Sequence, residues 1–231
     1  LRDAGGTPPG QLGACPATRP EGGLGNKGNP IQTGTVNKFQ RELDYASPGA
    51  SALRIERTYN SAAGSVASPW GRGWSANYFQ RLLVFLSSPP TASTGLVSII
   101  RPNGRIFNVP WTGSAFDHGP DSFARLEITG GGFRLSLEDD TIEEYDGAGR
   151  LLTIRARSGY VQTMLYGPEG RLASVTDSHG RSIGFTLGSD GRIAAASDPA
   201  GGQYTYSYDA NGNLAGVTYP DARTRTYHYE D

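Results

Sequence analysis

A repeat with a period of 21 residues fills the C-terminal part of the chain and limits its fold more than any other feature. Two columns keep this spacing: one contains Gly149, Gly170, Gly191 and Gly212, and the other contains Gly159, Gly180, Gly201 and Ala222. Glycine suits turns that need a positive φ, so each period has two turns and therefore two strands. We predict that residues 141–231 form an array of β-hairpins in which neighbouring repeats share a core.

Tyrosines follow the same period. The predicted aromatic column contains Tyr145, Tyr166, Tyr204, Tyr206, Tyr208, Tyr227 and Tyr229, and Leu187 stands at one step where the other repeats have tyrosine. Rings at alternate positions of a strand usually pack across strands, which predicts a structural role for the column. Exposed rings also stack on sugar faces, so Tyr204 and Tyr206 are the candidate glycan contacts.

The region from residue 28 to residue 140 has the period of two that is typical of half-buried strands. Large and polar residues alternate in segments 39–45, 53–59 and 133–137, with odd-numbered residues on one face, and Gly and Pro mark turns between strands. Stretch 74–88 lacks Gly and Pro, and its aromatic and β-branched content predicts a strand. We therefore expect a small irregular β domain over 28–140 and an all-β fold for the chain.

The first 27 residues are rich in Gly and Pro and too poor in apolar side chains to form a core, which predicts a flexible leader over 1–27. Cys15 is the only cysteine, so the chain has no intrachain disulfide and no cysteine-rich zinc site. The formal net charge of −1 provides no basic field for nucleic acid or anionic membranes. No apolar run is long enough to span a membrane.

The residues that could take part in catalysis or metal binding are better explained by structural roles. The three histidines, His118, His179 and His228, do not have metal-ligand spacing. The acidic cluster Glu138, Asp139, Asp140, Glu143 and Glu144 is predicted to be a solvated turn. The segment from Asp209 to Asn213 superficially suggests a calcium loop, but it lacks the spacing and the bidentate glutamate of such loops. We predict no catalytic residue, no metal site and no cofactor.

Two groups of motifs identify the chain as resembling a known family. Tyr208-Asp209-Ala210-Asn211-Gly212-Asn213-Leu214 closely resembles the YD repeat, also called the Rhs repeat, and Tyr145-Asp146-Gly147-Ala148-Gly149-Arg150-Leu151 is a second copy. Upstream, Gly28-Asn29-Pro30-Ile31, Arg57-Thr58-Tyr59-Asn60-Ser61 and Trp70-Gly71-Arg72-Gly73-Trp74 resemble the domain that commonly opens such proteins. Val36 departs from the family pattern, which usually has Gly there.

The resemblance implies the N-terminal part of a shell, in which a long β-sheet winds around a C-terminal toxin domain of a secreted or cell-surface bacterial protein. Its partner would be the remainder of its own chain. Asp198-Pro199-Ala200-Gly201 shares four letters with the family's self-cleavage motif, but Gly202 replaces the expected Leu, so we expect no cleavage there. Two alternatives stay open: a surface module that binds carbohydrate or calcium, and a fibre subunit that self-associates through an open strand edge at residues 227–229.

Overall fold

The computed structural model describes residues 31–32, 37–49, 52–63, 68–86, 95–119, 122 and 124–229. The predicted leader with Cys15, and the family departure at Val36, lie outside these residues. The described chain is all-β, as the sequence predicts. Its strands form three antiparallel sheets, and its two helical segments are 3₁₀ turns of three residues, Ser61–Ala63 and Pro168–Gly170.

The C-terminal part forms one sheet of eleven strands, which we call the repeat sheet, and each strand pairs with the next in sequence. Its strands are β8 (Ala124–Thr129), β9 (Gly132–Leu137), β10 (Ile142–Asp146), β11 (Leu151–Arg155), β12 (Val161–Tyr166), β13 (Leu172–Asp177), β14 (Ser182–Leu187), β15 (Ile193–Ser197), β16 (Gln203–Tyr208), β17 (Leu214–Thr218) and β18 (Thr224–Thr226). Strands β8 and β9 extend this sheet ahead of residue 141, where the sequence predicts the repeats to begin.

The turns of the repeat sheet share one construction. All eight residues of the two turn columns have a positive φ, between 63° at Ala222 and 87° at Gly201. At the turn after β10, the Gly149 N–H donates to the Asp146 carbonyl at 2.9 Å. The Asp146 carboxylate accepts hydrogen bonds from two backbone N–H groups of the same turn, an arrangement that recurs at Asp177, Asp198 and Asp209.

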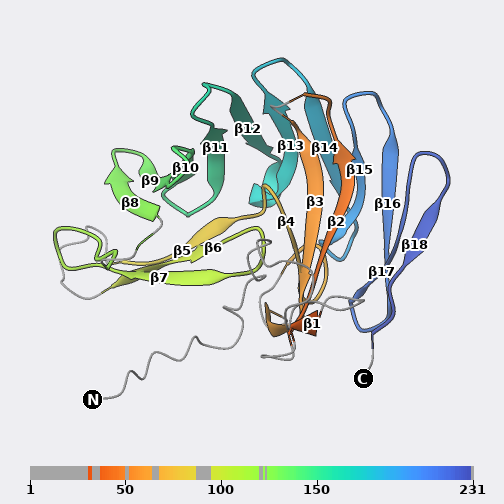
Figure 1. The fold of residues 1–231 in the computed structure, drawn as a ribbon, viewed down its shortest axis with the longest axis horizontal. Coiled ribbons are helices and arrows are strands. Elements are labelled where there is room, and N and C mark those ends of the chain that lie inside the picture. The colour runs from red at the N-terminus through yellow and green to blue at the C-terminus, as the bar shows by residue number, and fades with distance from the viewer. Residues whose placement is uncertain are drawn as a thin grey trace, which may run out of the picture.

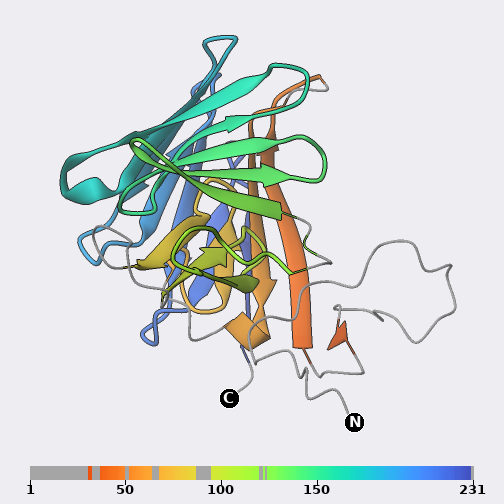
Figure 2. The ribbon, with the colours of Figure 1, turned by 90° about the vertical axis from the view of Figure 1, so that its left-hand side faces the viewer.

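Two smaller sheets precede the repeat sheet. The N-terminal sheet consists of β1 (Ile31–Gln32), β2 (Asn37–Ala46), β3 (Arg54–Asn60) and β4 (Trp74–Ala76), and a three-stranded sheet consists of β5 (Arg81–Phe85), β6 (Leu96–Ile100) and β7 (Ile106–Pro110). Strand β5 is joined to the repeat sheet, because the Leu82 N–H donates to the Gly149 carbonyl at 2.9 Å. Figure 2 shows the three-stranded sheet beside the first strands of the repeat sheet.

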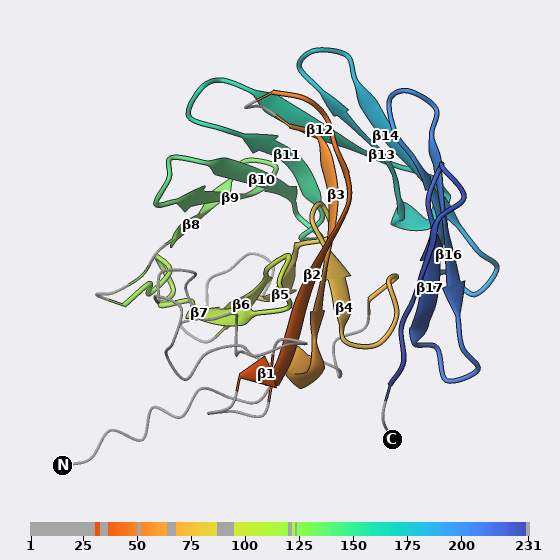
Figure 3. The ribbon, with the colours of Figure 1, turned by 45° about the vertical axis from the view of Figure 1, so that its right-hand side comes forward.

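The repeat sheet is curved, and the N-terminal sheet lies on its concave side (Figures 1 and 3). The inward-facing side chains of all three sheets form one hydrophobic core. Its most deeply buried aliphatic members, at most 2% exposed, are Leu53, Ile55, Leu82, Val97, Leu126, Leu135, Leu151, Val175, Ile183, Ile193, Leu214 and Val217. The concave face is therefore filled by protein side chains rather than exposed.

The prediction of one strand over 74–88 is wrong. Strand β4 ends at Ala76 and β5 starts at Arg81, and Tyr78 between them has a φ of 71°. The side chain of Asn77 holds this turn against β3: it accepts from the Glu56 N–H and donates to the Arg54 carbonyl, both at 2.8 Å. The turn is stabilised by long-range contacts, so no local Gly or Pro marks it.

The predicted face of segment 39–45 is also wrong in part. Leu43 is 56% exposed, whereas the side chain of Asp44 is fully buried and Glu42 is buried. Glu42 lies opposite the buried Arg57, and the pairing of β2 with β3 shifts between Leu43 and Tyr45, so Asp44 is the extra residue of a β-bulge. Two carboxylates are therefore turned inward where alternation predicts apolar side chains.

Candidate functional site

The candidate site is the interface between the N-terminal sheet, with its flanking loops, and the concave face of the repeat sheet. Trp70 forms the apolar centre of this interface and is completely buried. Its indole lies edge-on to Tyr206, Phe79 and Phe185, with ring centroids 4.9, 5.4 and 6.2 Å away. The preceding Pro69 carbonyl accepts the N–H of Ile193 at 2.8 Å, which ties this loop to the repeat sheet.

A buried ion pair between β2 and β3 forms the first polar contact with the repeats. Arg57 donates through Nε and Nη2 to the two carboxylate oxygens of Asp44 at 2.6 and 2.8 Å, and both side chains are fully buried. The Tyr206 hydroxyl donates to Asp44 at 2.9 Å, and Arg57 Nη2 donates to the Tyr227 hydroxyl at the same distance. Two tyrosines of the repeats thus complete a charged pair supplied by the N-terminal sheet.

Three aromatic rings surround the same guanidinium. The Cζ atom of Arg57 lies 4.9, 5.3 and 5.5 Å from the ring centroids of Trp74, Tyr206 and Tyr227. Burial alone would lower the pKa of Arg57, but the hydrogen bonds and charge of Asp44 outweigh it and raise the pKa above its ordinary value. The arginine is therefore held as a cation inside the interface.

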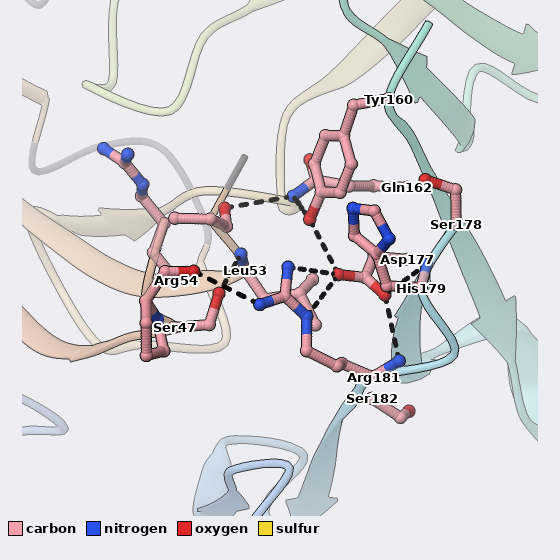
Figure 4. A network of polar contacts seen from close by, with 12 residues as sticks. Ser47, Leu53, Arg54, Tyr160, Gln162, Asp177, Ser178, His179, Arg181 and Ser182 are labelled. Atoms are coloured by element: carbon pink, nitrogen blue, oxygen red, sulfur yellow. Dashed lines mark hydrogen bonds and ion pairs between the residues drawn. The ribbon is translucent and has the colours of Figure 1, made fainter. Parts of the chain in front are cut away.

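A second polar network joins the loop before β3 to strands β12–β14 (Figure 4). The Asp177 carboxylate accepts hydrogen bonds from Tyr160, from the backbone of His179 and from Arg181, whose Nη1 also donates to the Pro48 carbonyl at 3.4 Å. Burial would raise the pKa of Asp177, but the hydrogen bonds, those from Arg181 above all, lower it below its usual value. The carboxylate thus stays ionised and orients Arg181.

Gln162 extends this network to the N-terminal sheet. Its Nε2 donates to the Tyr78 hydroxyl at 3.1 Å and to the Ala52 carbonyl at 3.4 Å. The Tyr78 hydroxyl in turn accepts the N–H of Arg54 at 3.3 Å, and burial raises the pKa of Tyr78 to about 12. The Gln162 amide and the Tyr78 phenol therefore connect strand β12 to strand β3 and to the turn after β4.

The third network corrects the prediction of a solvated acidic turn. Glu143 is 2% exposed and accepts hydrogen bonds from Arg101, from Gln80 Nε2 at 3.1 Å and from the Tyr145 hydroxyl at 2.6 Å. Burial, followed by the charge of Glu143, raises the pKa of Tyr145 well above its ordinary value. Because side chains alternate along β10, Glu143 points inward while its neighbours in the cluster stay half-buried or exposed.

The predicted aromatic column is brought together on the concave side. Tyr145, Tyr204 and Tyr206 are buried, and Tyr166, Tyr208, Tyr227 and Tyr229 are half-buried and pack on the core or on Trp74 and Tyr59. Tyr204 and Tyr206 are each only 6% exposed, and their hydroxyls donate to Asp198 and Asp44. These contacts favour the packing interpretation, and a glycan role for the two tyrosines stays a prediction.

The remaining candidate groups stay apart from one another. His179 and His228 are exposed and His118 is half-buried. Among the described residues, no three histidine, cysteine, aspartate or glutamate side chains come close enough to hold a metal ion. Within the same part of the chain, no helix has the length and apolar character needed to cross a membrane.

Sequence reasoning did not single out Asp44, Arg57 or Glu143 as site residues. A signal for one of them exists: Arg57 falls on the same face as Leu53 and Ile55 in the alternation of segment 53–59. A charged residue among buried strand positions requires a partner, so this pattern indicates an internal ion pair. The partner itself comes from another strand and has no comparable signal.

Comparisons with known protein families match two separate regions of the chain. A family model described as a domain of unknown function, DUF6531, matches residues 28–107, and a model described as the RHS repeat matches residues 145–182 and 189–224. No curated protein matches the chain. Among solved structures, a Tc holotoxin pore from Photorhabdus luminescens is similar at 12% identity and a TM-score of 0.32. That match covers 84% of this chain but 10% of the holotoxin chain.

Proposed function

We propose, from the premise that this chain belongs to the RHS-repeat proteins and carries a DUF6531 domain ahead of its repeats, that it is a structural segment of a β-sheet shell. In this proposal the repeat sheet is a portion of the shell wall. The shell encloses a toxin or effector domain, and the segment described here acts without catalysis of its own.

The observation that carries the proposal is the continuous pairing of eleven strands into one curved sheet, with a folded element seated on its concave side (Figure 3). Backbone hydrogen bonds between neighbouring repeats make a wall without gaps, since every strand from β9 to β17 has a partner on both sides. A wall of this kind separates the two sides of the sheet, which enclosure requires.

We assign a separate role to each of the two domains predicted from sequence. Residues 28–140 would supply the cap that covers the wall together with the first two wall strands, β8 and β9, and residues 141–231 would supply the first repeats. The Arg57–Asp44 pair with Tyr206 and Tyr227 would fix the cap on the wall. The partner is the remainder of the protein's own chain, and the setting is a secreted or cell-surface bacterial protein used in competition between bacteria.

Limited proteolysis of the complete gene product tests enclosure. If the proposal is right, its C-terminal domain resists a protease that rapidly digests the same domain expressed alone. Arg57→Met, which weakens the contact between the cap and the wall, should speed digestion of that domain, whereas Arg223→Met, at an exposed ion pair, should leave the protection unchanged. Digestion of the C-terminal domain of the unmodified protein as fast as the isolated domain contradicts the proposal.

A further inference from the structure

A cavity of about 570 Å³ lies between the turn edge of the repeat sheet and the loops around β4 and β5. Most of the surface of its wall is apolar and includes the rings of Trp74, Phe79 and Tyr166 together with Leu187, and five arginines also line it. Cavities that bind small molecules usually have this size and this predominance of apolar and aromatic side chains. The arrangement of the repeats explains why a space exists at this place.

The cavity occurs at the one step where the tyrosine column is interrupted. The hydroxyls of Tyr166, Tyr208 and Tyr229 each donate to a backbone carbonyl 15 residues earlier in the chain, at 2.7, 2.9 and 2.7 Å. Leu187 occupies the equivalent position and has no hydroxyl to offer the equivalent carbonyl, that of Leu172. Both Leu187 and Leu172 line the cavity.

The arginines of the repeats show the same interruption. Arg150 lies over the ring of Tyr166 and Arg192 over the ring of Tyr208, with Cζ 5.3 and 4.9 Å from the ring centroids. Arg171 occupies the equivalent position and also lines the cavity, but the column provides leucine there instead of a ring. A guanidinium is thus placed where its two counterparts hold an aromatic face.

Two of the residues that line the cavity each have a buried side-chain atom without a hydrogen-bond partner among the described residues. These atoms are Oε1 of Gln80, whose side chain is buried and whose Nε2 is engaged by Glu143, and Nη1 of Arg192. A buried acceptor and a buried donor left without partners are costly, so such atoms commonly indicate a bound group. A hydroxyl can donate to the first and accept from the second.

We propose that this cavity binds a small molecule with a phenolic ring, which takes the place that a tyrosine side chain takes in the neighbouring repeats. The ring would stack on Arg171 among Trp74, Phe79 and Tyr166. The hydroxyl would reach the Leu172 carbonyl or the unpartnered Gln80 and Arg192 atoms. The ligand is either a free phenol or the side chain of a tyrosine derivative, and both present the same chemistry.

Calorimetric titration with p-cresol, the tyrosine side-chain analogue, tests the proposal, with N-acetyltyrosinamide as the arm that distinguishes the second source. The Leu187→Tyr variant supplies the missing ring from the chain itself, so we expect its affinity for p-cresol to fall at least about tenfold. Thr186→Tyr is the matched control, because it adds the same ring to the same strand at an exposed position and leaves binding unchanged. Toluene, which lacks the hydroxyl, should bind at least about tenfold more weakly than p-cresol.

Each other outcome overturns the proposal. Absence of p-cresol and N-acetyltyrosinamide binding to the unmodified chain means that the cavity holds water only. Equal binding by Leu187→Tyr means that the ligand lies elsewhere, and equal binding of toluene means that the hydroxyl is not recognised. If Leu187→Tyr does not fold, amide chemical shifts of the unmodified chain decide: p-cresol should move those of Leu172, Leu187 and Ile193, and changes confined to other residues contradict the site.

Discussion

Single buried polar residues decide how the two parts of this molecule meet. Arg57 is fully buried, and its Nη1 has no hydrogen-bond partner among the described residues, yet three aromatic rings and one carboxylate surround the guanidinium. The rings compensate part of the hydration that the cation loses. Its ion pair contacts the hydroxyls of Tyr206 and Tyr227, and these contacts favour the position that the repeat sheet takes here.

We expect Arg57→Met to lower the free energy of unfolding by about 3–5 kcal/mol, because it leaves Asp44 buried without its counter-charge. Urea denaturation measures the change. Arg223→Met is the control: Arg223 is 81% exposed and pairs with the exposed Asp221, so its loss should change stability by no more than about 0.5 kcal/mol. Similar losses in the two variants would show that the buried pair does not stabilise the interface.

Tyrosines give the chain a predictable response to alkaline pH. Burial is the main cause that raises the pKa of every one of the 12 tyrosines, to about 12 for Tyr78, Tyr166, Tyr219 and Tyr229. An unfolded tyrosine loses its proton near pH 10, so between about pH 10 and 12 the folded state holds protons that the unfolded state releases. Stability present below pH 10 is therefore lost as the pH rises.

Urea denaturation from about pH 8 to about pH 12 should show a progressive fall in the free energy of unfolding that begins near pH 10. The ultraviolet absorbance of tyrosinate should rise together with the loss of circular dichroism. Titration of most tyrosines near pH 10 in a chain that keeps its β-sheet signal would contradict the expectation.

At the scale of the hairpin, a short local code builds each turn of the repeat sheet. A residue at positive φ reverses the chain in all eight turns of the two columns, and in four of them the carboxylate of an aspartate accepts two backbone hydrogen bonds within the turn. Ala222 holds a φ of 63° at the last step of one column, which shows that glycine is favoured there by conformation rather than required by space. The two columns differ in what surrounds them.

Two glycine variants separate conformation from crowding. At Gly201 an added Cβ meets nothing within 4 Å, so Gly201→Ala should cost only the strain of positive φ, about 1–2 kcal/mol. At Gly149 the Cβ would meet the carbonyl oxygen of Leu82, and the Gly149 carbonyl accepts the Leu82 N–H. We expect Gly149→Ala to cost about 1–3 kcal/mol more than Gly201→Ala.

Thermal and urea denaturation of both variants provide the comparison. Equal losses would mean that β5 moves away from the repeat sheet without cost, and that the contact at Leu82 is not part of the stabilising structure. The difference between the variants, rather than either loss alone, is the informative quantity, because both share the strain of positive φ.

For the whole molecule, the sheets share one core rather than having separate ones. Residues from β3, β5, β6, β8, β14 and β17 belong to the same cluster of buried side chains. Trp70 and the N-terminal sheet cover the inner face of the repeat sheet. The N-terminal sheet has few strands, and its own apolar face is buried only by packing against the repeat sheet. Neither part is expected to keep its structure alone.

We therefore expect one cooperative thermal transition, with equal calorimetric and van't Hoff enthalpies. Arg57→Met should lower the temperature of that single transition without splitting it. Two separate transitions in the unmodified chain would show that the N-terminal sheet and the repeat sheet fold independently, and that their interface adds little to stability.

Much of the fold was accessible from sequence, because its determinants are local. The two turn columns, the period of 21 residues and the alternation within strands all arise from neighbouring residues, so the hairpin array and the all-β class could be predicted. The break in stretch 74–88 was missed, since Asn77 stabilises that turn through contacts with β3 rather than through a turn sequence.

The sequence by itself determined that Tyr206 and Tyr227 stand 21 residues apart at equivalent positions of two repeats, but it did not determine which groups their hydroxyls contact. Only the tertiary structure decided that Tyr206 and Tyr227 complete the Arg57–Asp44 pair. The same holds for Glu143, which alternation turns inward and which Arg101 neutralises from the turn after β6. Local spacing sets the face of the strand on which a side chain lies. The partner of that side chain depends on how distant strands pack, and a buried charge is stable only when its partner is in place.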